Sequence, residues 1–349
     1  MKLFEYLTSS KHEQVIFCHD EPSGLKAIIA IHSTALGPAL GGCRFWHYES
    51  EEDALNDALR LSRGMTYKNA AMGLDNGGAK CVVLLDETGQ KSEAALKALG
   101  RFIQSLGGRY ITAEDVGATP DDMLIIASET RYVGGLPGRS GDPSPLTALG
   151  TLRSIEVTLE YLGKKDGLLG ATVAISGLGH VGSTLAKLLH DRGAKLYLTD
   201  IRSEKMAELA KQFDAIAVQP DEIYSMPVDV FAPCALGGIL NDTTIDQLKC
   251  QAIVGSANNQ LLSDLHGDLL FERNILYAPD FIVNGAGVIN VANEFHPDGY
   301  HEERVLAQIQ KIGDTLKELY LKSEQTNTPP FRLANQLAEQ RIYAKAHHA

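Results

Sequence analysis

The spacing of apolar residues changes along the chain and predicts its elements. In the first 133 residues, stretches of alternating apolar and polar positions, which predict strands, are mixed with stretches of helical period. Ser50 followed by Asp53 is typical of a helix start. Strands are expected at 14–18, 25–32, 43–47, 81–86 and 110–112, and helices from 50, over 93–106 and from 119.

The rest of the chain follows a more regular rhythm, in which short apolar stretches alternate with helical ones. This alternation predicts a parallel sheet covered by helices on both faces. The predicted fold class is therefore α/β, with an N-terminal α/β domain and a doubly wound, Rossmann-type second domain. The strands are expected at 171–176, 195–199, 228–232 and 252–256, and the helices at 181–191, 203–213 and 301–324.

The domain boundary is expected where glycine, proline and serine accumulate, between Val133 and Pro145. A chain of 349 residues also exceeds the size at which one hydrophobic core stops growing. We therefore predict a first domain at 1–133, joined by a C-terminal helix at about 325–349, and a second domain at 134–324.

The composition is that of a globular protein, with 44% hydrophobic and 22% charged residues. A net charge of −12 argues against nucleic-acid and membrane-surface partners. Neither a signal peptide nor a transmembrane stretch is indicated, so we expect a cytoplasmic protein. The cysteines are scattered without a C-x-x-C pair, and reduced, mostly buried thiols with no metal site are expected. They are Cys18, Cys43, Cys81, Cys234 and Cys250.

A glycine-rich loop follows the strand expected at 171–176, with the spacing G-x-G-x-x-G and a predicted helix after it. The glycines allow a tight turn and close approach of a pyrophosphate to the helix N-terminus. Asp200, at the end of the next strand, can bind ribose hydroxyls and favours NAD over NADP, although Arg202 weakens that preference. The predicted cofactor contacts are Gly177, Gly179, His180, Val181, Gly182, Asp200 and Ile201.

Two lysines and one acid are candidates for proton chemistry. Lys68 and Lys80 flank a small, apolar run with a Gly-Gly pair, which favours a half-buried lysine whose proton affinity is lowered by desolvation. Asp115 follows a predicted strand. The alternative is that the lysines are solvated and that Asp115 is a turn residue.

Taken together, eight segments resemble the family of glutamate, leucine, phenylalanine and valine dehydrogenases. The resemblance covers nearly the whole chain and is closest to the leucine-specific members. It implies a homo-oligomer, octameric or dimeric. The segments are 37–42, 65–70, 77–80, 112–117, 143–147, 232–238, 255–260 and 287–291.

The resemblance also implies roles for the candidates. Lys68 would bind the substrate carboxylate, Lys80 would be the low-pKa lysine that activates water, and Asp115 would be its acid/base partner. The implied reaction is NAD-dependent oxidative deamination of an L-amino acid to the 2-oxo acid, ammonium and NADH. Thr147 and Asn259 would lie near the nicotinamide, and Ala235 in the cofactor wall.

The positions that line the side-chain pocket in the family are apolar here. Glutamate dehydrogenases carry a lysine and a serine where this chain has Leu40 and Val291, so a second carboxylate would be buried without a partner. The resemblance therefore implies a branched aliphatic substrate, leucine with valine and isoleucine, as in branched-chain amino acid catabolism. The substrate-binding residues it implies are Lys68, Leu40, Gly41, Gly42, Met65, Ala113, Val288 and Val291.

Two alternatives stay open. The stretch from Gly134 to Asp142 is shorter than in the leucine-specific pattern, and Gly134 stands where a threonine is usual. The alternative substrate is therefore phenylalanine or tryptophan. A non-catalytic NAD-binding regulator is the alternative from another class. The retained Lys68, Lys80 and Asp115 argue against it.

Overall fold

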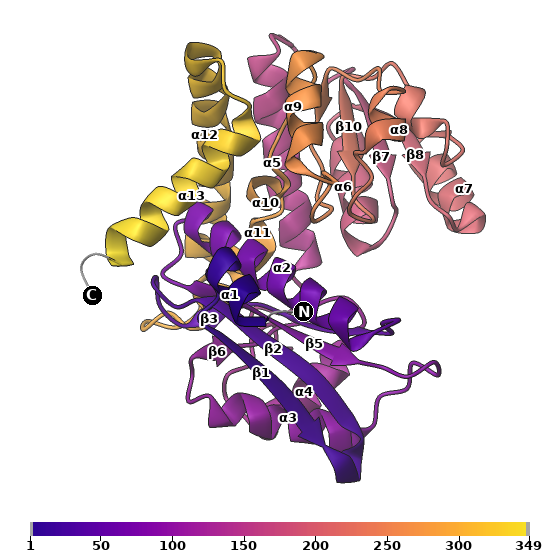
Figure 1. Ribbon diagram of the computed structural model, residues 1–349. Helices are drawn as coiled ribbons and strands as arrows, with labels where there is room; N and C mark the ends of the chain where they lie inside the picture. Colours follow the sequence, from indigo (N-terminus) through magenta and orange to yellow (C-terminus); the bar gives the residue numbers. More distant parts are fainter. Residues whose placement is uncertain (1–2, 347–349) are drawn as a thin grey trace. The chain divides into compact units, whose positions relative to one another are not determined.

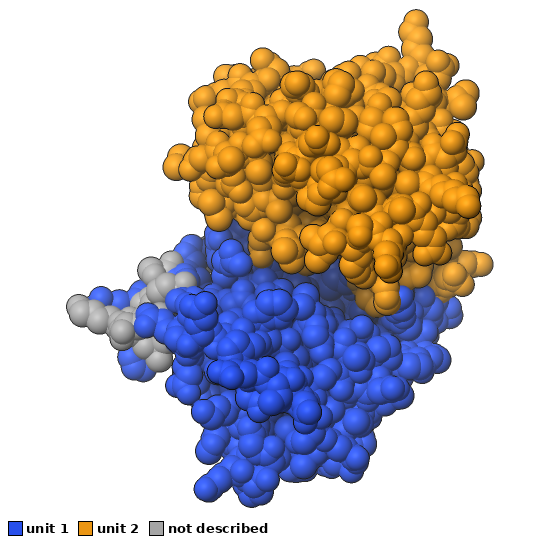
Figure 2. Space-filling model, turned by 90° about the vertical axis from the view of Figure 1, so that its right-hand side faces the viewer, with its two compact units in different colours: residues 1–142, 288–301, 337–349 blue, residues 143–287, 302–336 orange. Residues whose placement is uncertain are grey.

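The computed structural model describes residues 3–346, which divide into two compact units (Figure 2). Unit 1 holds the residues up to Asp142, residues 288–301 and those from Leu337 on. Unit 2 holds residues 143–287 and 302–336. Compared with the predicted ranges, residues 134–142 and 288–301 belong to unit 1, and 325–336 belong to unit 2. The expected end of the C-terminal helix, 347–349, lies outside the described residues.

The sheet of unit 1 is mixed (Figure 1). Strand β2 pairs antiparallel with β1 and β5, whereas β3 and β4 run parallel to β5, and β6 runs parallel to β3. The order is β1-β2-β5-β3-β6, with β4 also on β5. The bounds are β1 Gln14–Asp20, β2 Leu25–Ser33, β3 Ala39–Leu40, β4 Cys43–Trp46, β5 Gly77–Leu84 and β6 Tyr110–Ile111.

Helices cover both faces of this sheet, because side chains of a strand alternate between its faces. On β2, Ile29 and Ile31 pack in the cluster that contains residues of α3 and α4, whereas Ile28 and Ala30 pack with α2. The helices of this part are α1 Leu3–Ser10, the 3₁₀ turn η1 Glu21–Ser23, α2 Glu51–Ala71, α3 Glu93–Ser105 and α4 Pro120–Ala127.

Unit 2 contains a parallel sheet in the order β12-β11-β10-β7-β8-β9. Its strands are β7 Thr172–Ser176, β8 Lys195–Thr199, β9 Ile216–Ala217, β10 Val230–Pro233, β11 Ala252–Ile253 and β12 Leu276–Tyr277. Its helices are α5 Ser144–Tyr161, α6 His180–His190, α7 Ser203–Gln212, η2 Ile223–Ser225, α8 Asp242–Ile245, α9 Asp264–Glu272, α10 Asp280–Val283 and α12 Glu302–Thr326. Helix α11, Ala286–Asn293, enters unit 1 at Val288, and α13, Pro330–Ala346, enters it at Leu337.

The chain order of this sheet reverses at β7. The strand that follows β7 in sequence, β8, lies on one side of it, and the later β10 lies on the other. Such a switch point opens a crevice at the carboxyl ends of the strands, where α/β sheets bind ligands. The predicted α/β fold with a Rossmann-type domain is confirmed.

The predicted elements differ from the structure in two informative places. Helix α5, Ser144–Tyr161, was not predicted, because buried residues lie on several of its sides and leave no single apolar stripe. Strand β5 begins at Gly77, four residues before the predicted strand, so Lys80 lies inside the strand. Within residues 3–346, no helix is both long and apolar enough to cross a membrane.

Candidate active site

Lys80 lies on β5 and points to the face of the sheet that α2 covers. Its neighbours Ala79 and Cys81 pack on the opposite face, with α3 and α4, whereas Val82 packs with α2. Only 4% of Lys80 is exposed, so it is more deeply buried than the sequence predicted. Its Nζ lies 2.9 Å from Oδ2 of Asp115, and the two predicted proton-handling residues therefore form an ion pair.

Glycines allow the backbone segments around this ion pair to approach each other. A methyl group on Gly78 would overlap the backbone of Thr66, and one on Gly41 would overlap the carbonyl group of Ala79. A methyl group on Gly42 would lie 2.8 Å from Cβ of Asp115. Side chains at Gly78 and Gly41 would push α2 and the segment after β3 away from β5, and one at Gly42 would displace residues 113–115.

Asp115 has a second cationic partner that the sequence did not reveal. Nε of Arg44, on β4, donates to Oδ2 of Asp115 at 3.1 Å, and Nη1 of Arg44 donates to Oδ2 of Asp57 at 2.8 Å. Burial by itself raises the pKa of Asp115, but Lys80 and Arg44 outweigh this effect and lower the pKa to about 2. Asp115 is therefore ionised at neutral pH and acts as a hydrogen-bond acceptor.

Lys68 and Met65 lie on α2, three positions apart, so they share one side of this helix. Both side chains are partly buried. Next to Lys68, the buried Asn69 donates from Nδ2 to the carbonyl oxygens of Leu40 and Gly77, at 3.3 and 2.6 Å. These bonds tie α2 to β3 and to the start of β5.

Four of the predicted substrate-binding residues, all apolar, come together in one cluster of unit 1. Leu40, Ala113 and Val291 are buried in it, and Val288 packs against it. Ile111, Ala292 and Phe295 complete the cluster. All seven residues of the cluster are hydrophobic.

Gly134 lies directly against this cluster. A methyl group on Gly134 would lie 2.5 Å from Cγ1 of Val291 and 3.0 Å from the ring of Phe295. The loop after Gly134 is held by Glu294, whose carboxylate accepts from Gly135 N at 2.8 Å and from the hydroxyl of Ser140. The short loop and the α11 residues of unit 1 therefore fill the space where a larger residue at position 134 would lie.

In unit 2, the predicted glycine loop connects β7 to α6. Gly177 has a φ of 98°, and a methyl group on it would lie 2.5 Å from Cβ of Ala235. A methyl group on Gly182 would overlap the carbonyl group of Gly177, whereas one on Gly179 would meet no atom within 4 Å. The loop therefore requires glycine for packing at two positions and leaves open space in front of the third.

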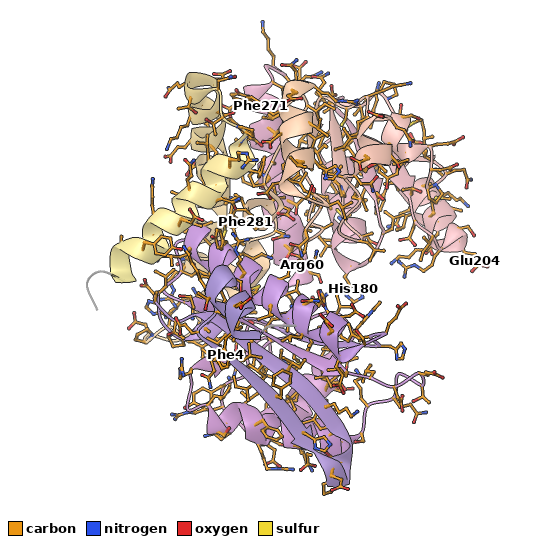
Figure 3. The ribbon with its side chains drawn as sticks, viewed as in Figure 1. Phe4, Arg60, His180, Glu204, Phe271 and Phe281 are labelled. Atoms are coloured by element: carbon orange, nitrogen blue, oxygen red, sulfur yellow. The ribbon has the colours of Figure 1, made fainter. Side chains whose placement is uncertain are left out.

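The N-terminus of α6 begins at this open space. Gly179 is the N-cap and provides no side-chain hydrogen bond to the first turn, where Val181 is partly buried. His180, labelled in Figure 3, is exposed as the first helical residue. Such a turn presents N–H groups and a positive helix dipole to an anion.

Asp200 follows β8 and accepts from Leu178 N, in the glycine loop, at 2.7 Å. Nε of Arg202 donates to Oδ1 of Asp200 at 2.9 Å. This hydrogen bond is the largest cause of the lowered pKa of Asp200. Ile201, between them, is 93% exposed.

Asn259 and Ala235 lie in the loops that follow neighbouring strands. Ala235 follows β10 and contacts the glycine loop. Asn259 follows β11, and its backbone carbonyl oxygen accepts from Gly238 N at 2.7 Å. Thr147 lies on α5, where its hydroxyl donates to the carbonyl oxygen of Pro143 at 2.9 Å. The structure thus brings the glycines, Ala235 and Asn259 to adjacent loops of unit 2.

Two family models match consecutive parts of the chain. The model described as "Glu/Leu/Phe/Val dehydrogenase, dimerisation domain" matches residues 12–132. The model described as "Glutamate/Leucine/Phenylalanine/Valine dehydrogenase" matches residues 134–199 and 196–349. The chain belongs to this family. Both the resemblance and the expected enzyme class, an amino-acid dehydrogenase, are confirmed.

Individual members of the Glu/Leu/Phe/Val dehydrogenase family match over nearly the full length. A leucine dehydrogenase of Geobacillus stearothermophilus is 52% identical over 98% of this chain and 94% of its own. A phenylalanine dehydrogenase of Bacillus thermotolerans is 46% identical over 98% and 91%. The crystal structure of the L-tryptophan dehydrogenase from Nostoc punctiforme covers 99% of both chains, with a TM-score of 0.84 and 44% identity.

Two residues that support the site, Arg44 and Asp57, were not predicted from the sequence. Arg44 alternates with Cys43 and Phe45, which pack in the core, and this alternation could have placed it on the side of Lys80. Asp57 lies between the buried Ala54 and Ala58 of α2, so a carboxylate on an apolar helix face was the available signal.

Among residues 3–346, His, Cys, Asp and Glu side chains form no group of three or more that could hold an ion. All five cysteines are free, and four of them are buried, so the expected mostly buried thiols are confirmed.

Proposed function

We propose that this enzyme catalyses the NAD-dependent oxidative deamination of a branched aliphatic L-amino acid, leucine first and valine and isoleucine next. The products are the 2-oxo acid, ammonium, NADH and a proton. The observation that carries the proposal is the apolar cluster of Leu40, Ala113 and Val291, which residues 113–115 link directly to the ion pair of Lys80 and Asp115. Ala113 precedes Asp115 by two residues.

The apolar character of the cluster supports an aliphatic substrate. A glutamate side chain would bring a second carboxylate among apolar groups with no cation to pair with, which costs several kcal/mol. An aliphatic side chain gains free energy by leaving water instead. Neighbouring aliphatic amino acids differ by one methylene, which changes selectivity by only about 10- to 200-fold, so leucine, valine and isoleucine all remain substrates.

In the proposed mechanism each charged residue has one task. Lys68 binds the substrate carboxylate. Asp115, ionised because its pKa is lowered to about 2, accepts hydrogen bonds from the substrate amine. Both of its cationic neighbours bind Oδ2, so Oδ1 is the atom we assign to the amine.

Lys80 is assigned to the water step. Bound nicotinamide supplies the chemistry of hydride acceptance from Cα, which leaves an imine on the substrate. The Lys80 ammonium group first gives a proton to solvent. As a neutral amine it then orients the water that adds to the imine carbon, and it takes up the proton that this water loses. Loss of ammonium from the resulting carbinolamine gives the 2-oxo acid.

The glycine loop supports NAD as the cofactor. Open space in front of Gly179 and the uncapped first turn of α6 fit a pyrophosphate, and Asp200 at the end of β8 fits the ribose hydroxyls. We propose a homo-oligomer, dimeric or octameric. The match of residues 12–132 to a family model described as a dimerisation domain supports an oligomer. A cytoplasmic location stays a prediction.

Comparison of kcat/KM for leucine, valine, phenylalanine and glutamate with NAD tests the proposal. We expect the order leucine, valine, phenylalanine, glutamate, with at least about 10³-fold between the first and the last, as expected for an unpaired buried carboxylate. A phenylalanine rate above that of leucine would favour the second candidate. Its support is the phenylalanine dehydrogenase of Bacillus thermotolerans, which is 46% identical to this chain. No turnover of any amino acid would leave an NAD-binding regulator.

A further inference from the structure

Arg44 connects two carboxylates inside unit 1. It donates from Nε to Asp115 at 3.1 Å and from Nη1 to Asp57 at 2.8 Å. The exposed fractions of the Arg44, Asp57 and Asp115 side chains are 18%, 14% and 17%. Asp115 is paired with two cations, Lys80 and Arg44, so Asp57 supplies the second negative charge that balances them.

The two ends of Arg44 are anchored by different elements. Its strand, β4, is fixed because Cys43 and Phe45 are buried in the core on the opposite face. Asp57 is fixed on α2 and also accepts from the hydroxyl of Tyr48 at 2.8 Å. A guanidinium group held at both ends can bind Asp115 in only one orientation, because its donors lie in a rigid plane.

This orientation determines which oxygen of Asp115 is engaged. Arg44 and Lys80 both bind Oδ2, at 3.1 and 2.9 Å, and Oδ1 takes part in neither contact. If Arg44 were absent, the carboxylate could rotate about its bond to Cβ and present either oxygen to Lys80.

We propose that Arg44, held by Asp57, is a positioning residue that fixes the carboxylate of Asp115 so that Oδ1 faces the substrate amine. The proposal rests on the deamination assigned above. It adds Arg44 and Asp57 to the residues on which turnover depends, although neither touches the substrate.

The charge of Arg44 and its geometry have separable effects. Burial raises the pKa of Asp115, and Lys80 and Arg44 lower it, so loss of the Arg44 charge moves this pKa upward. Lysine at position 44 keeps the charge but loses the two-ended contact. The titratable and charged groups around Asp115 are Lys80, Arg44, Asp57, Cys43, Tyr48 and Tyr110. Burial raises the pKa of Cys43 to about 12 and also raises that of both tyrosines, so these three stay neutral below pH 9.

The experiment compares Arg44→Lys, Arg44→Gln and Asp57→Asn with the unmodified full chain, using whichever of leucine, valine or phenylalanine that chain oxidises fastest. We expect kcat to fall about 100-fold in Arg44→Lys, as for a small misplacement of a catalytic group, with an unchanged acid limb of the pH profile. In Arg44→Gln, kcat falls similarly and the acid limb rises by about 2 pH units. Asp57→Asn, which keeps the acceptor, is expected to lower kcat about 10-fold.

Arg332→Lys is the matched control. Arg332 is likewise an arginine bound to a carboxylate, that of Asp268, but it lies in unit 2. Its kcat is expected to stay within about twofold, as for other ion pairs remote from the reacting atoms. The proposal is overturned if folded Arg44 variants, judged by circular dichroism, keep the kcat and pH profile of the parent and lose only thermal stability. Absence of turnover in the unmodified chain would overturn the proposed reaction, and this inference with it.

Discussion

Asp115 in unit 1 and Asp200 in unit 2 each follow a strand and bind an arginine, yet they are held in different ways. Asp115 receives Lys80 and Arg44 from two other strands, and all three side chains are largely buried. Asp200 binds Arg202, only two residues later, and the backbone N–H of Leu178. The Arg202 side chain is 56% exposed.

The site around Asp115 is therefore built from side chains, whereas the site around Asp200 is built mainly from the main chain. Around Asp115, the chemistry depends on charged groups that tertiary packing brings together. Around Asp200, glycines shape a loop whose N–H groups and open space come from consecutive residues. Substitutions in unit 1 should therefore affect turnover, and those in unit 2 should affect cofactor binding.

The largest expected effect is that of Lys80→Ala. Removing the group assigned to proton transfer should lower kcat by about 10³- to 10⁴-fold. The dissociation constant of NADH, measured by fluorescence titration, should stay within about twofold, as expected for a residue that touches no cofactor. Lys187→Ala, at an exposed ion pair on α6, is the control and should change neither. Equal loss of NADH binding and turnover would contradict the division between the two units.

A smaller effect is expected from alanine at the glycines of the loop. Gly182→Ala would place a methyl group on the carbonyl of Gly177, so we expect a loss of about 1–3 kcal/mol of stability and weaker NAD binding. Gly179→Ala meets no atom within 4 Å and should leave stability unchanged while raising KM for NAD about 10-fold. Thermal unfolding and NAD titration of both variants test this contrast. Equal destabilisation by the two would contradict it.

The same contrast explains what could be predicted from the sequence. Gly177, Gly182 and Asp200 belong to one strand–loop–helix–strand segment, so their proximity follows from local pattern and the parallel sheet. Lys80 and Asp115 were identified as candidates, but their ion pair depends on the register between β5 and strands far away in sequence.

Strand β5 shows why part of the site could not be predicted from neighbouring residues in the sequence. Gly77 and Gly78 precede the strand expected at 81–86, yet they pair with Ala39 and Leu40. Gly78 also lets α2 pack closely, because a methyl group there would overlap Thr66. Arg44 and Asp57 stabilise each other across a strand and a helix. Neither residue carries a motif, so only the folded structure reveals the contact.

Removal of the Asp200 carboxylate should change cofactor choice without changing the chemistry. Asp200→Ala frees the Arg202 guanidinium, and we expect the ratio of kcat/KM for NAD over NADP to fall about 10- to 100-fold. In Asp200→Ala/Arg202→Ala, the use of NADP should fall again, because the cation that meets the 2′-phosphate is lost. Initial rates with both cofactors measure the ratio. An unchanged preference in the single variant would remove the role given to Asp200.

The smallest expected effect concerns the free energy of unfolding at acid pH, and it compares the carboxylates of Asp115 and Asp200 directly. The pKa of Asp115 is lowered to about 2, below its ordinary value near 4, so its stabilisation is present above pH 4 and is lost as the pH falls towards 2. A shift of this size corresponds to about 2 kcal/mol.

Trp46, the single tryptophan, lies on β4 of unit 1 and reports the unfolding of that unit. Urea unfolding followed by its fluorescence between pH 5 and pH 2 should show that Asp115→Asn has lost about 2 kcal/mol at pH 5 and almost nothing at pH 2. Asp200→Asn should leave this transition nearly unchanged, because its partner Arg202 is solvated and lies in unit 2. If Asp115→Asn were equally destabilising at both pH values, the loss would reflect packing, and the charged contacts with Lys80 and Arg44 would not be its cause.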